Sequence, residues 1–173
     1  MKCPVCQHDN FEGVDSCENC DADLCGSMLP AGGEIESKLL TDALKQLEPS
    51  SPITVSPQAT VADAIKIMVD KGMGCVLVAE VDKLLGVFTE RDALRKVAHR
   101  YAEVCKSPVS EFMTADPESL TGDAPIGFAV NLMAVGGYRH VPIIENDKLT
   151  GIISVRDVMS YMSKWYPDIV ASA

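Results

Sequence analysis

The sequence predicts an α/β (α+β) fold made of two similar halves, preceded by a small metal-binding unit. Three observations predict this architecture. The chain repeats itself at an offset of 65 residues, each copy has the order helix, strand, strand, helix, and four cysteines near the N-terminus form two closely spaced pairs. Self-similarity at a fixed offset is the signature of a duplicated supersecondary unit.

The composition limits the size and the class of the protein. With 173 residues, 47% apolar and 23% charged, it is typical of one ordinary globular domain or two small ones. The formal net charge of −10 disfavours binding to nucleic acid or to anionic membrane surfaces. The longest uncharged stretch, residues 124–138, is too short to span a bilayer, and no basic-then-apolar leader opens the chain. We therefore expect a cytoplasmic protein without membrane contact.

The N-terminal unit is predicted from Cys3, Cys6, Cys17 and Cys20, the four cysteines paired at ligand spacing. Two residues between cysteines let both thiolates of a turn point at one ion, and two such turns supply the tetrahedral shell that Zn²⁺ favours. Disulfides are the alternative, but cytosolic thiols stay reduced. Iron accepts the same ligands, as in a rubredoxin-like electron carrier, but Phe11 is the one aromatic side chain here to shield a redox centre. We predict a structural zinc site.

Residues 1–24 resemble the short zinc-ribbon domains of many microbial proteins, and we assign residues 1–26 to such a ribbon. The resemblance lies in Cys-Pro-x-Cys, an Asn four residues later, Cys-x-x-Cys and a Leu. Zinc ribbons usually carry Gly directly after each cysteine pair, where this chain has Gln7 and Asp21, so we expect a less relaxed backbone there. The unit is too small to fold without its ion. Its charges are mostly acidic, which favours a protein partner over nucleic acid.

Residues 27–48 are predicted to connect the ribbon to the rest of the chain. Three glycines, a proline and a serine in residues 26–33 indicate a flexible linker. In residues 34–47 the apolar positions recur on one helical face and Pro49 follows, which predicts an amphipathic helix that packs on the next domain or pairs in a dimer. Cys25, Cys75 and Cys105 lack partners at ligand spacing, and we assign them no role.

The repeat aligns residues 59–92 with residues 124–157 without a gap, and 12 of the 34 pairs are identical. In each copy the apolar period changes from helical to extended in the same order. The predicted helices begin each copy at 61–68 and 126–133, the predicted strands are 75–79, 84–88, 140–144 and 149–153, and a second helix ends near Val97 or Met162.

Each copy contains the same motif, from Gly86 to Asp92 and from Gly151 to Asp157: Gly, two apolar residues, Thr or Ser, two variable residues and Asp. With these motifs, residues 49–164 resemble two CBS domains in tandem, the pair called a Bateman module. The resemblance implies an α/β disc with pseudo-twofold symmetry, with repeat 1 at residues 49–104 and repeat 2 at 105–166. It also implies two clefts that bind adenine nucleotides, and homodimers formed through the repeats.

The Thr/Ser-x-x-Asp motif has two interpretations. The hydroxyl and the carboxylate can cap the start of a helix, which explains the residue types by themselves. At a strand-to-helix junction they can also bind a phosphate and a ribose diol. In repeat 2, Arg139 and His140 replace Gly74 and Cys75 of repeat 1, so the second site is better equipped for phosphate. The predicted nucleotide-binding residues are Thr54, Val55, Thr89, Arg91, Asp92, Ser119, Leu120, Arg139, His140, Ser154, Arg156 and Asp157.

Together these features predict a regulatory module that binds AMP, ADP or ATP and is not an enzyme. No serine or thiol is paired with a histidine by a recognisable motif. Two alternatives remain: a zinc-ribbon nucleic-acid-binding protein that its repeats dimerise, and an iron electron carrier.

Overall fold

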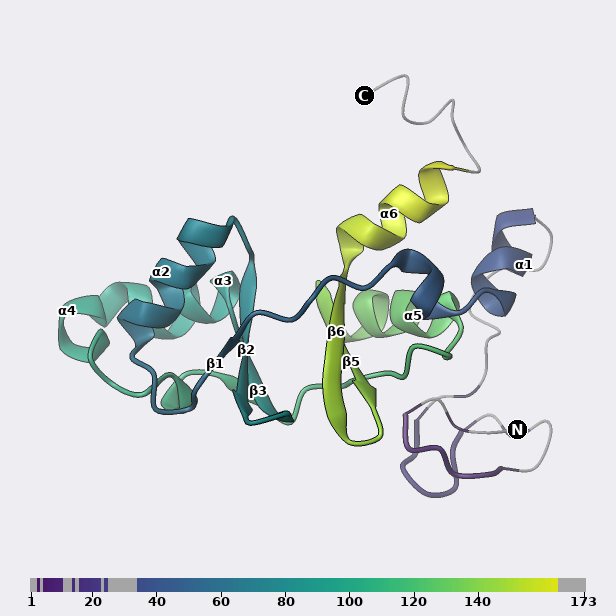
Figure 1. Cartoon of the computed structure of the whole chain (residues 1–173), viewed down its shortest axis with the longest axis horizontal. Helices are drawn as coiled ribbons and strands as arrows, with labels where there is room; N and C mark the ends of the chain where they lie inside the picture. Colours follow the sequence, from purple (N-terminus) through teal and green to yellow (C-terminus); the bar gives the residue numbers. More distant parts are fainter. Residues whose placement is uncertain are drawn as a thin grey trace. The chain divides into compact units, whose positions relative to one another are not determined.

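The computed structural model describes residues 3, 5–10, 14, 16–22, 24 and 34–164 (Figure 1). Phe11, Cys25 and the predicted linker 26–33 lie outside the described residues. By its internal contacts the chain divides into two units. Unit 1 consists of residues 1–50, 118–145 and 151–173, and unit 2 consists of residues 51–117 and 146–150.

Unit 2 contains a four-stranded sheet with the order β1-β2-β3-β4. The strands are β1 (Thr54–Val55), β2 (Cys75–Glu80), β3 (Lys83–Thr89) and β4 (Thr114–Ala115). β2 and β3 form an antiparallel hairpin, β1 joins β2 in parallel, and β4 joins β3 antiparallel. The strands predicted at 75–79 and 84–88 are confirmed, each with one or two further residues.

Helix α2 (Val61–Lys71) covers this sheet and confirms the helix predicted at 61–68. The Thr60 hydroxyl caps its first turn by accepting from the Asp63 N–H at 3.1 Å. Gly72, with φ 61°, ends it in the left-handed region that suits glycine. The buried helix residues Val61, Ala64 and Met68 form one apolar core with Val76, Val78 and Phe88 of the strands.

The helix after β3 departs from the single helix that the sequence predicts. It begins as α3 (Glu90–Asp92), widens into a π-helical turn, η3 (Ala93–Val97), and continues as η4 (Ala98–Arg100) and α4 (Tyr101–Val104). At the π turn the Ala98 N–H bonds to the Ala93 carbonyl, five residues back. The helical path therefore runs past the predicted end at Val97, and the short helix η5 (Val109–Glu111) follows it.

Among the described residues, unit 1 contains the remaining helices, strand β5 and most of strand β6, and the turn of the β5–β6 hairpin with the start of β6 (residues 146–150) belongs to unit 2 (Figure 1). The elements are α1 (Glu34–Thr41), η2 (Leu44–Leu47), α5 (Ile126–Gly136), β5 (His140–Glu145), β6 (Lys148–Ser154) and α6 (Val155–Ser163). The elements predicted for the second repeat are confirmed, and α6 is a continuous helix. Their core includes Leu39, Leu44, Leu120, Ile126 and Ile153. None of the described helices has the length and apolar character to cross a membrane.

The amphipathic helix predicted over residues 34–47 is wrong in its second half, because α1 ends at Thr41. Ala43 is extended, with φ −79° and ψ 148°, so it cannot continue the helix. The Leu44 N–H donates to the Ala124 carbonyl at 2.8 Å and the Lys45 N–H to the Gly122 carbonyl at 2.9 Å. These long-range hydrogen bonds replace helical ones, and the predicted apolar face is divided between α1 and η2.

Each unit combines the lead-in segment of one repeat, the residues around Leu44 or Val109, with the helix and most of the hairpin of the other. In unit 1, the segment that holds Leu44 pairs with residues just before α5. In unit 2, the Val109 N–H donates to the Ala59 carbonyl at 2.8 Å, just before α2. Leu44 and Val109 are equivalent in the 65-residue repeat. The duplication therefore extends to the lead-in segments, and their packing partners are exchanged.

Candidate functional site

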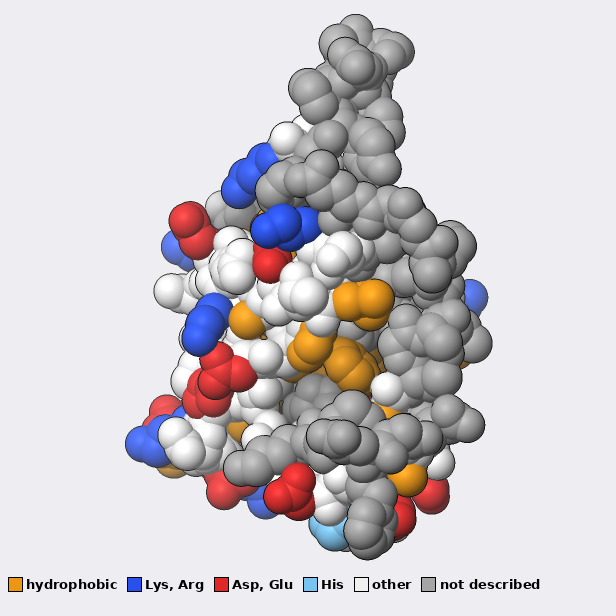
Figure 2. Space-filling model, turned by 90° about the vertical axis from the view of Figure 1, so that its right-hand side faces the viewer, with side chains coloured by type: hydrophobic (Ala, Val, Ile, Leu, Met, Phe, Trp, Pro, Cys, Tyr) orange, Lys and Arg blue, Asp and Glu red, His pale blue; other side chains and the backbone are white. Residues whose placement is uncertain are grey.

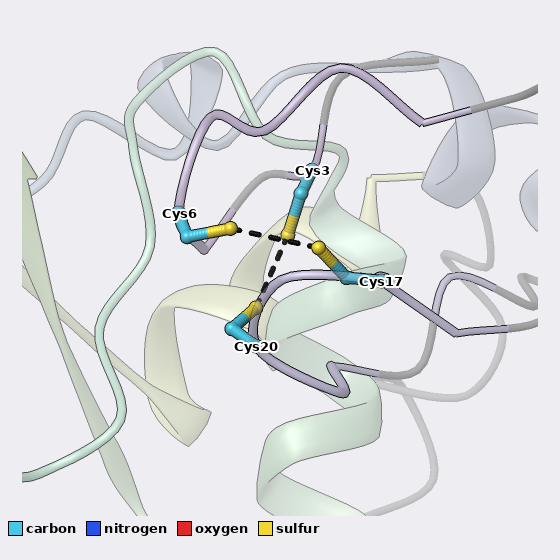
Figure 3. Close-up of side chains that lie close together, drawn as sticks. All are labelled: Cys3, Cys6, Cys17 and Cys20. Carbon is cyan, nitrogen blue, oxygen red and sulfur yellow. Dashed lines mark hydrogen bonds between the residues drawn. The ribbon is translucent and has the colours of Figure 1, made fainter.

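The four predicted metal ligands lie together. Their sulfur atoms are all within 4.8 Å of one another, with Cys3 Sγ 3.7 Å from Cys20 Sγ and Cys6 Sγ 3.5 Å from Cys17 Sγ (Figure 3). A tetrahedron of Zn–S bonds of 2.3 Å has edges of about 3.8 Å. The cluster therefore has the size and the donor chemistry of a four-thiolate metal site.

Two equivalent turns position these thiolates. In the first turn the Cys3 N–H donates to the His8 carbonyl at 2.8 Å, and the Gln7 N–H donates to the Cys3 carbonyl at 2.9 Å. Cys17, Asp21 and Ala22 repeat this pattern in the second turn, with the same two distances. Gln7 has φ 62° and Asp21 has φ 55°, so both occupy the left-handed region. The expected strain after each cysteine pair is confirmed, because both positions call for the backbone freedom of glycine.

Asn10 joins the two turns, a role that the sequence analysis missed. Its side chain is buried; Nδ2 donates to the His8 carbonyl at 3.1 Å, and Oδ1 accepts from the Glu18 N–H at 2.9 Å. An amide at this place satisfies one group from each turn. The Asn that follows the first cysteine pair by four residues in the ribbon pattern was the available signal.

The surroundings of the thiols shift their pKa values in opposite directions. Partial burial of the thiol, together with the neighbouring thiols of Cys6, Cys17 and Cys3, raises the pKa of Cys20 to about 12, and burial also raises the pKa of Cys3. For Cys17, burial acts upward, but N–H donors from Asn19, Cys20 and Asn10 outweigh it and lower the pKa to about 6. Hydrogen bonding by the Asn19 side chain is the main cause that lowers the pKa of Cys6. The cluster thus already stabilises negative charge on part of its sulfurs.

The junction between β3 and α3 carries the first Thr-x-x-Asp motif. The Thr89 hydroxyl accepts from the Asp92 N–H at 3.2 Å, and the Asp92 Oδ2 accepts from the Thr89 N–H at 3.0 Å. This is a complete capping box, so the capping interpretation is confirmed here. Burial raises the pKa of Asp92, but Lys96 and Thr89 outweigh burial and hold it below its usual value.

The junction between β6 and α6 has the same capping box. The Ser154 hydroxyl accepts from the Asp157 N–H at 3.4 Å, and the Asp157 Oδ2 accepts from the Ser154 N–H at 2.7 Å. The Val155 N–H donates to the Arg139 carbonyl at 3.0 Å. Two of the first three N–H groups of α6 are therefore already used, so fewer remain for a phosphate than the sequence predicts.

The other predicted nucleotide-binding residues lie at different depths. In unit 2, Thr89 lies in the row of Cys75, whereas Thr54 lies in the row of Leu77, two residues, about 7 Å, further along β2. Val55 and Leu120 are buried, Thr54, Arg91, Arg139 and Arg156 are exposed, and Ser119 and His140 are half-buried. The junction motifs are thus each brought together, while Thr54 and Val55 are set back from Thr89 within their sheet.

Lys96 and Thr114 at the first junction were missed by the sequence analysis. Lys96 Nζ lies 2.8 Å from Asp92 Oδ1, and the Thr114 hydroxyl donates to the same oxygen at 3.3 Å. The spacing of Asp92 and Lys96, four residues apart on a helix, was a visible signal for an ion pair. Thr114 gave no local signal, because β4 brings it to β3 from 22 residues away.

Comparison with known proteins identifies the repeats. The CBS domain family matches residues 44–99 and 109–164, so the four clustered cysteines lie outside the match. An uncharacterised 17.7 kDa protein of Acidianus ambivalens is 34% identical over 117 residues, which are 66% of this chain and 70% of that protein. The CBS domain-containing protein CBSCBSPB1 of Arabidopsis thaliana is 36% identical over 62% of this chain, but this covers 19% of its own length.

Solved structures share the fold. A CBS-domain containing protein from Agrobacterium tumefaciens is 31% identical, with a TM-score of 0.65 over 69% of this chain and 98% of that one. A CBS domain protein from Pyrobaculum aerophilum, 22% identical, has a TM-score of 0.61 over 66% of this chain and 88% of its own, and its solved structure is a complex with AMP. The fold of the repeats therefore has an AMP-bound counterpart.

Proposed function

Since this chain belongs to the CBS domain family, we propose that it is a non-enzymatic regulatory module that binds AMP, ADP or ATP and passes its occupancy to a partner. The observation that carries the proposal is the duplicated strand-to-helix junction, where a hydroxyl and a carboxylate three residues apart face the same helix start. The AMP complex of a protein with the same fold supports it.

In this proposal the motif residues contact different parts of the nucleotide. The carboxylate of Asp157 or Asp92 accepts from the ribose diol, and Ser154 or Thr89 lies near phosphate. Arg91, Arg139, His140 and Arg156 offset the ligand's negative charge in a protein of net charge −10. Thr54, Val55, Ser119 and Leu120, which precede the first helix of each repeat, complete the proposed sites.

The test is calorimetric titration of the full chain with each adenine nucleotide, with Asp157→Ala as the main variant. Losing a charge-assisted ribose contact should weaken binding by about 1.5–3 kcal/mol, roughly ten- to a hundredfold. Loss of a cap alone should lower stability by about 1 kcal/mol and leave affinity intact. Asp70→Ala, which removes the same charge from an exposed site on α2, is the control. If no binding is detected at millimolar nucleotide, the proposal is wrong. The motif would then serve only as a helix cap, and the repeats would serve as a dimerisation scaffold.

The ribbon is proposed to hold one structural zinc ion through Cys3, Cys6, Cys17 and Cys20 and to contact a protein partner. The size of the sulfur cluster supports a metal ion bound by four thiolates, and iron as well as zinc accepts four thiolate ligands. Metal analysis with a visible spectrum distinguishes the two, because a ferric thiolate site is coloured and a zinc site is colourless. A red protein would indicate bound iron, and the ribbon would then be interpreted as an electron carrier.

The protein partner is preferred to nucleic acid because of charge. On the face shown in Figure 2, Lys and Arg side chains are interspersed with Asp and Glu and do not form a continuous basic patch. Nucleic-acid sites concentrate basic residues on one surface. We expect a homodimer formed through the repeats, and light scattering of the purified chain measures its mass.

A further inference from the structure

The carboxylate of Asp92 is fully engaged inside unit 2. Its Oδ2 accepts from the Thr89 N–H at 3.0 Å and from the Thr89 hydroxyl at 2.6 Å. Its Oδ1 lies 2.8 Å from Lys96 Nζ and accepts from the Thr114 hydroxyl at 3.3 Å. The side chain is only 9% exposed. Four donors around two buried oxygens leave little capacity for a ribose diol.

The carboxylate of Asp157 is engaged on one oxygen. Its Oδ2 accepts from the Ser154 N–H at 2.7 Å and from the Ser154 hydroxyl at 2.8 Å. Within the part of the chain that the structure describes, Oδ1 has no hydrogen-bond or ion-pair partner. Asp157 is half-buried, so its side chain is less enclosed than that of Asp92.

The difference between the two aspartates comes from Lys96 and Thr114, the two residues that contact Asp92 Oδ1. At the offset of 65, Lys96 corresponds to Tyr161 and Thr114 corresponds to Pro49. The Tyr161 hydroxyl donates to Asp42 instead, and proline has no side-chain donor. The identical aspartates therefore have different partners.

Lys96 is also held by two further acceptors. Its Nζ donates to the Phe112 carbonyl at 2.9 Å and to the Met113 carbonyl at 3.2 Å, so all three of its N–H groups have acceptors. The segment it holds is tightly packed, since a Cβ on Gly86 would lie 2.4 Å from Met113 Sδ and 2.8 Å from the Thr114 carbonyl. A ligand at Asp92 would have to break this whole network.

We infer that Lys96 and Thr114 make Asp92 a structural anchor, so that the adenine nucleotide binds at the Asp157 junction and not at the Asp92 junction. The inference rests on the proposed function and specifies which repeat supplies the ribose acceptor. Lys96 is thus a specificity-determining residue: it fixes the lead-in segment of repeat 2 and removes Asp92 from ligand binding.

The test compares matched variants of the full chain by calorimetric titration with AMP, ADP and ATP. We expect one nucleotide per chain, an affinity reduced at least tenfold by Asp157→Asn, and an affinity within about twofold of wild type in the paired variant Asp92→Asn with Lys96→Met. Replacing both members of the pair avoids an unpaired buried charge, which would destabilise the fold.

A thermal melt measures the anchor without any nucleotide. Lys96→Met should lower the midpoint by about 3–10 °C, and Lys66→Met, on the exposed surface of α2, should change it by about 1 °C at most. An unchanged midpoint in Lys96→Met contradicts the anchor role.

The titration separates failure of this inference from failure of the proposed function. Two equal sites per chain, or loss of binding in the paired variant, overturns the inference and leaves nucleotide binding in place. No binding by the wild type overturns the proposed function, and the assignment to Asp157 with it.

Discussion

Replacing Gln7 by glycine should tighten metal binding by the ribbon. Gln7 has φ 62°, and its N–H must keep this orientation to donate to the Cys3 carbonyl at 2.9 Å. A residue with a Cβ in the left-handed region destabilises the fold by about 1–2 kcal/mol, whereas glycine adopts this conformation readily. Glycine also loses more conformational entropy on folding, which offsets about 0.5–1 kcal/mol of the gain. The net gain is about 1 kcal/mol.

This gain should appear as metal affinity. The ribbon's apolar cluster has only Cys3, Cys17 and Leu24 as buried members among the described residues, so the ion supplies most of its folding free energy. A gain of about 1 kcal/mol corresponds to roughly fivefold tighter binding. Competition against a chromophoric chelator, at fixed pH and with the full chain, measures this difference.

Gln7→Ala is the matched control, because it removes the same exposed side chain and keeps the Cβ. We expect Gln7→Ala to bind the metal as the wild type does. Equal affinities for the glycine and alanine variants would show that the backbone at Gln7 is not strained. Asp21, with φ 55°, should behave in the same way, with Asp21→Asn as the control for its charge.

Three further predictions concern single residues. Cys17→Ser should lose most of the bound metal and leave the circular dichroism of the repeats unchanged, because the ribbon shares no buried core residue with them and contacts them through the partly buried Val5 and Phe128; full metal content in this variant contradicts the site. The lowered pKa of Asp92 gives stability that is present above about pH 4 and lost as the pH falls through the folded-state pKa, so acid should lower the melting midpoint more in wild type than in Asp92→Asn. Gly86→Ala should lower the free energy of unfolding in urea by about 2–3 kcal/mol, because the added Cβ would clash with Met113 and Thr114. Gly72→Ala should lower it by about 1 kcal/mol, because Gly72 has φ 61° but open space around it. Equal losses in the two variants would contradict the packing argument.

The elements that the sequence predicts well are those with local signals. β2 begins at Cys75 as predicted, because an apolar run between turn residues suffices to define a strand. α2 begins after its Thr60 cap and ends at Gly72, and both signals lie within the helix or next to it. The capping boxes at Asp92 and Asp157 were predicted on the same local grounds.

The errors occur where distant residues compete for backbone hydrogen bonds. The apolar period of residues 34–47 continues through Ala43, but the N–H groups of Leu44 and Lys45 pair with carbonyls about 80 residues away. No periodicity within the segment reports such a partner. Likewise, the Asp92–Lys96 spacing is visible in sequence, but the carbonyls of Phe112 and Met113 that hold Lys96 become neighbours only through β4.

Identity between two repeats does not by itself imply the same function. Asp92 and Asp157 occupy equivalent positions and make the same capping box, so the cap alone is enough to retain aspartate in both. A carboxylate oxygen contributes to ligand affinity only if its hydrogen bond is formed on binding, and the Asp92 Oδ1 already has Lys96 and Thr114. The residues around the motif, and not the motif, therefore decide which junction can respond to a ligand. We infer that Lys96 and Thr114, which correspond to Tyr161 and Pro49 at the offset of 65, make the Asp92 junction part of the scaffold.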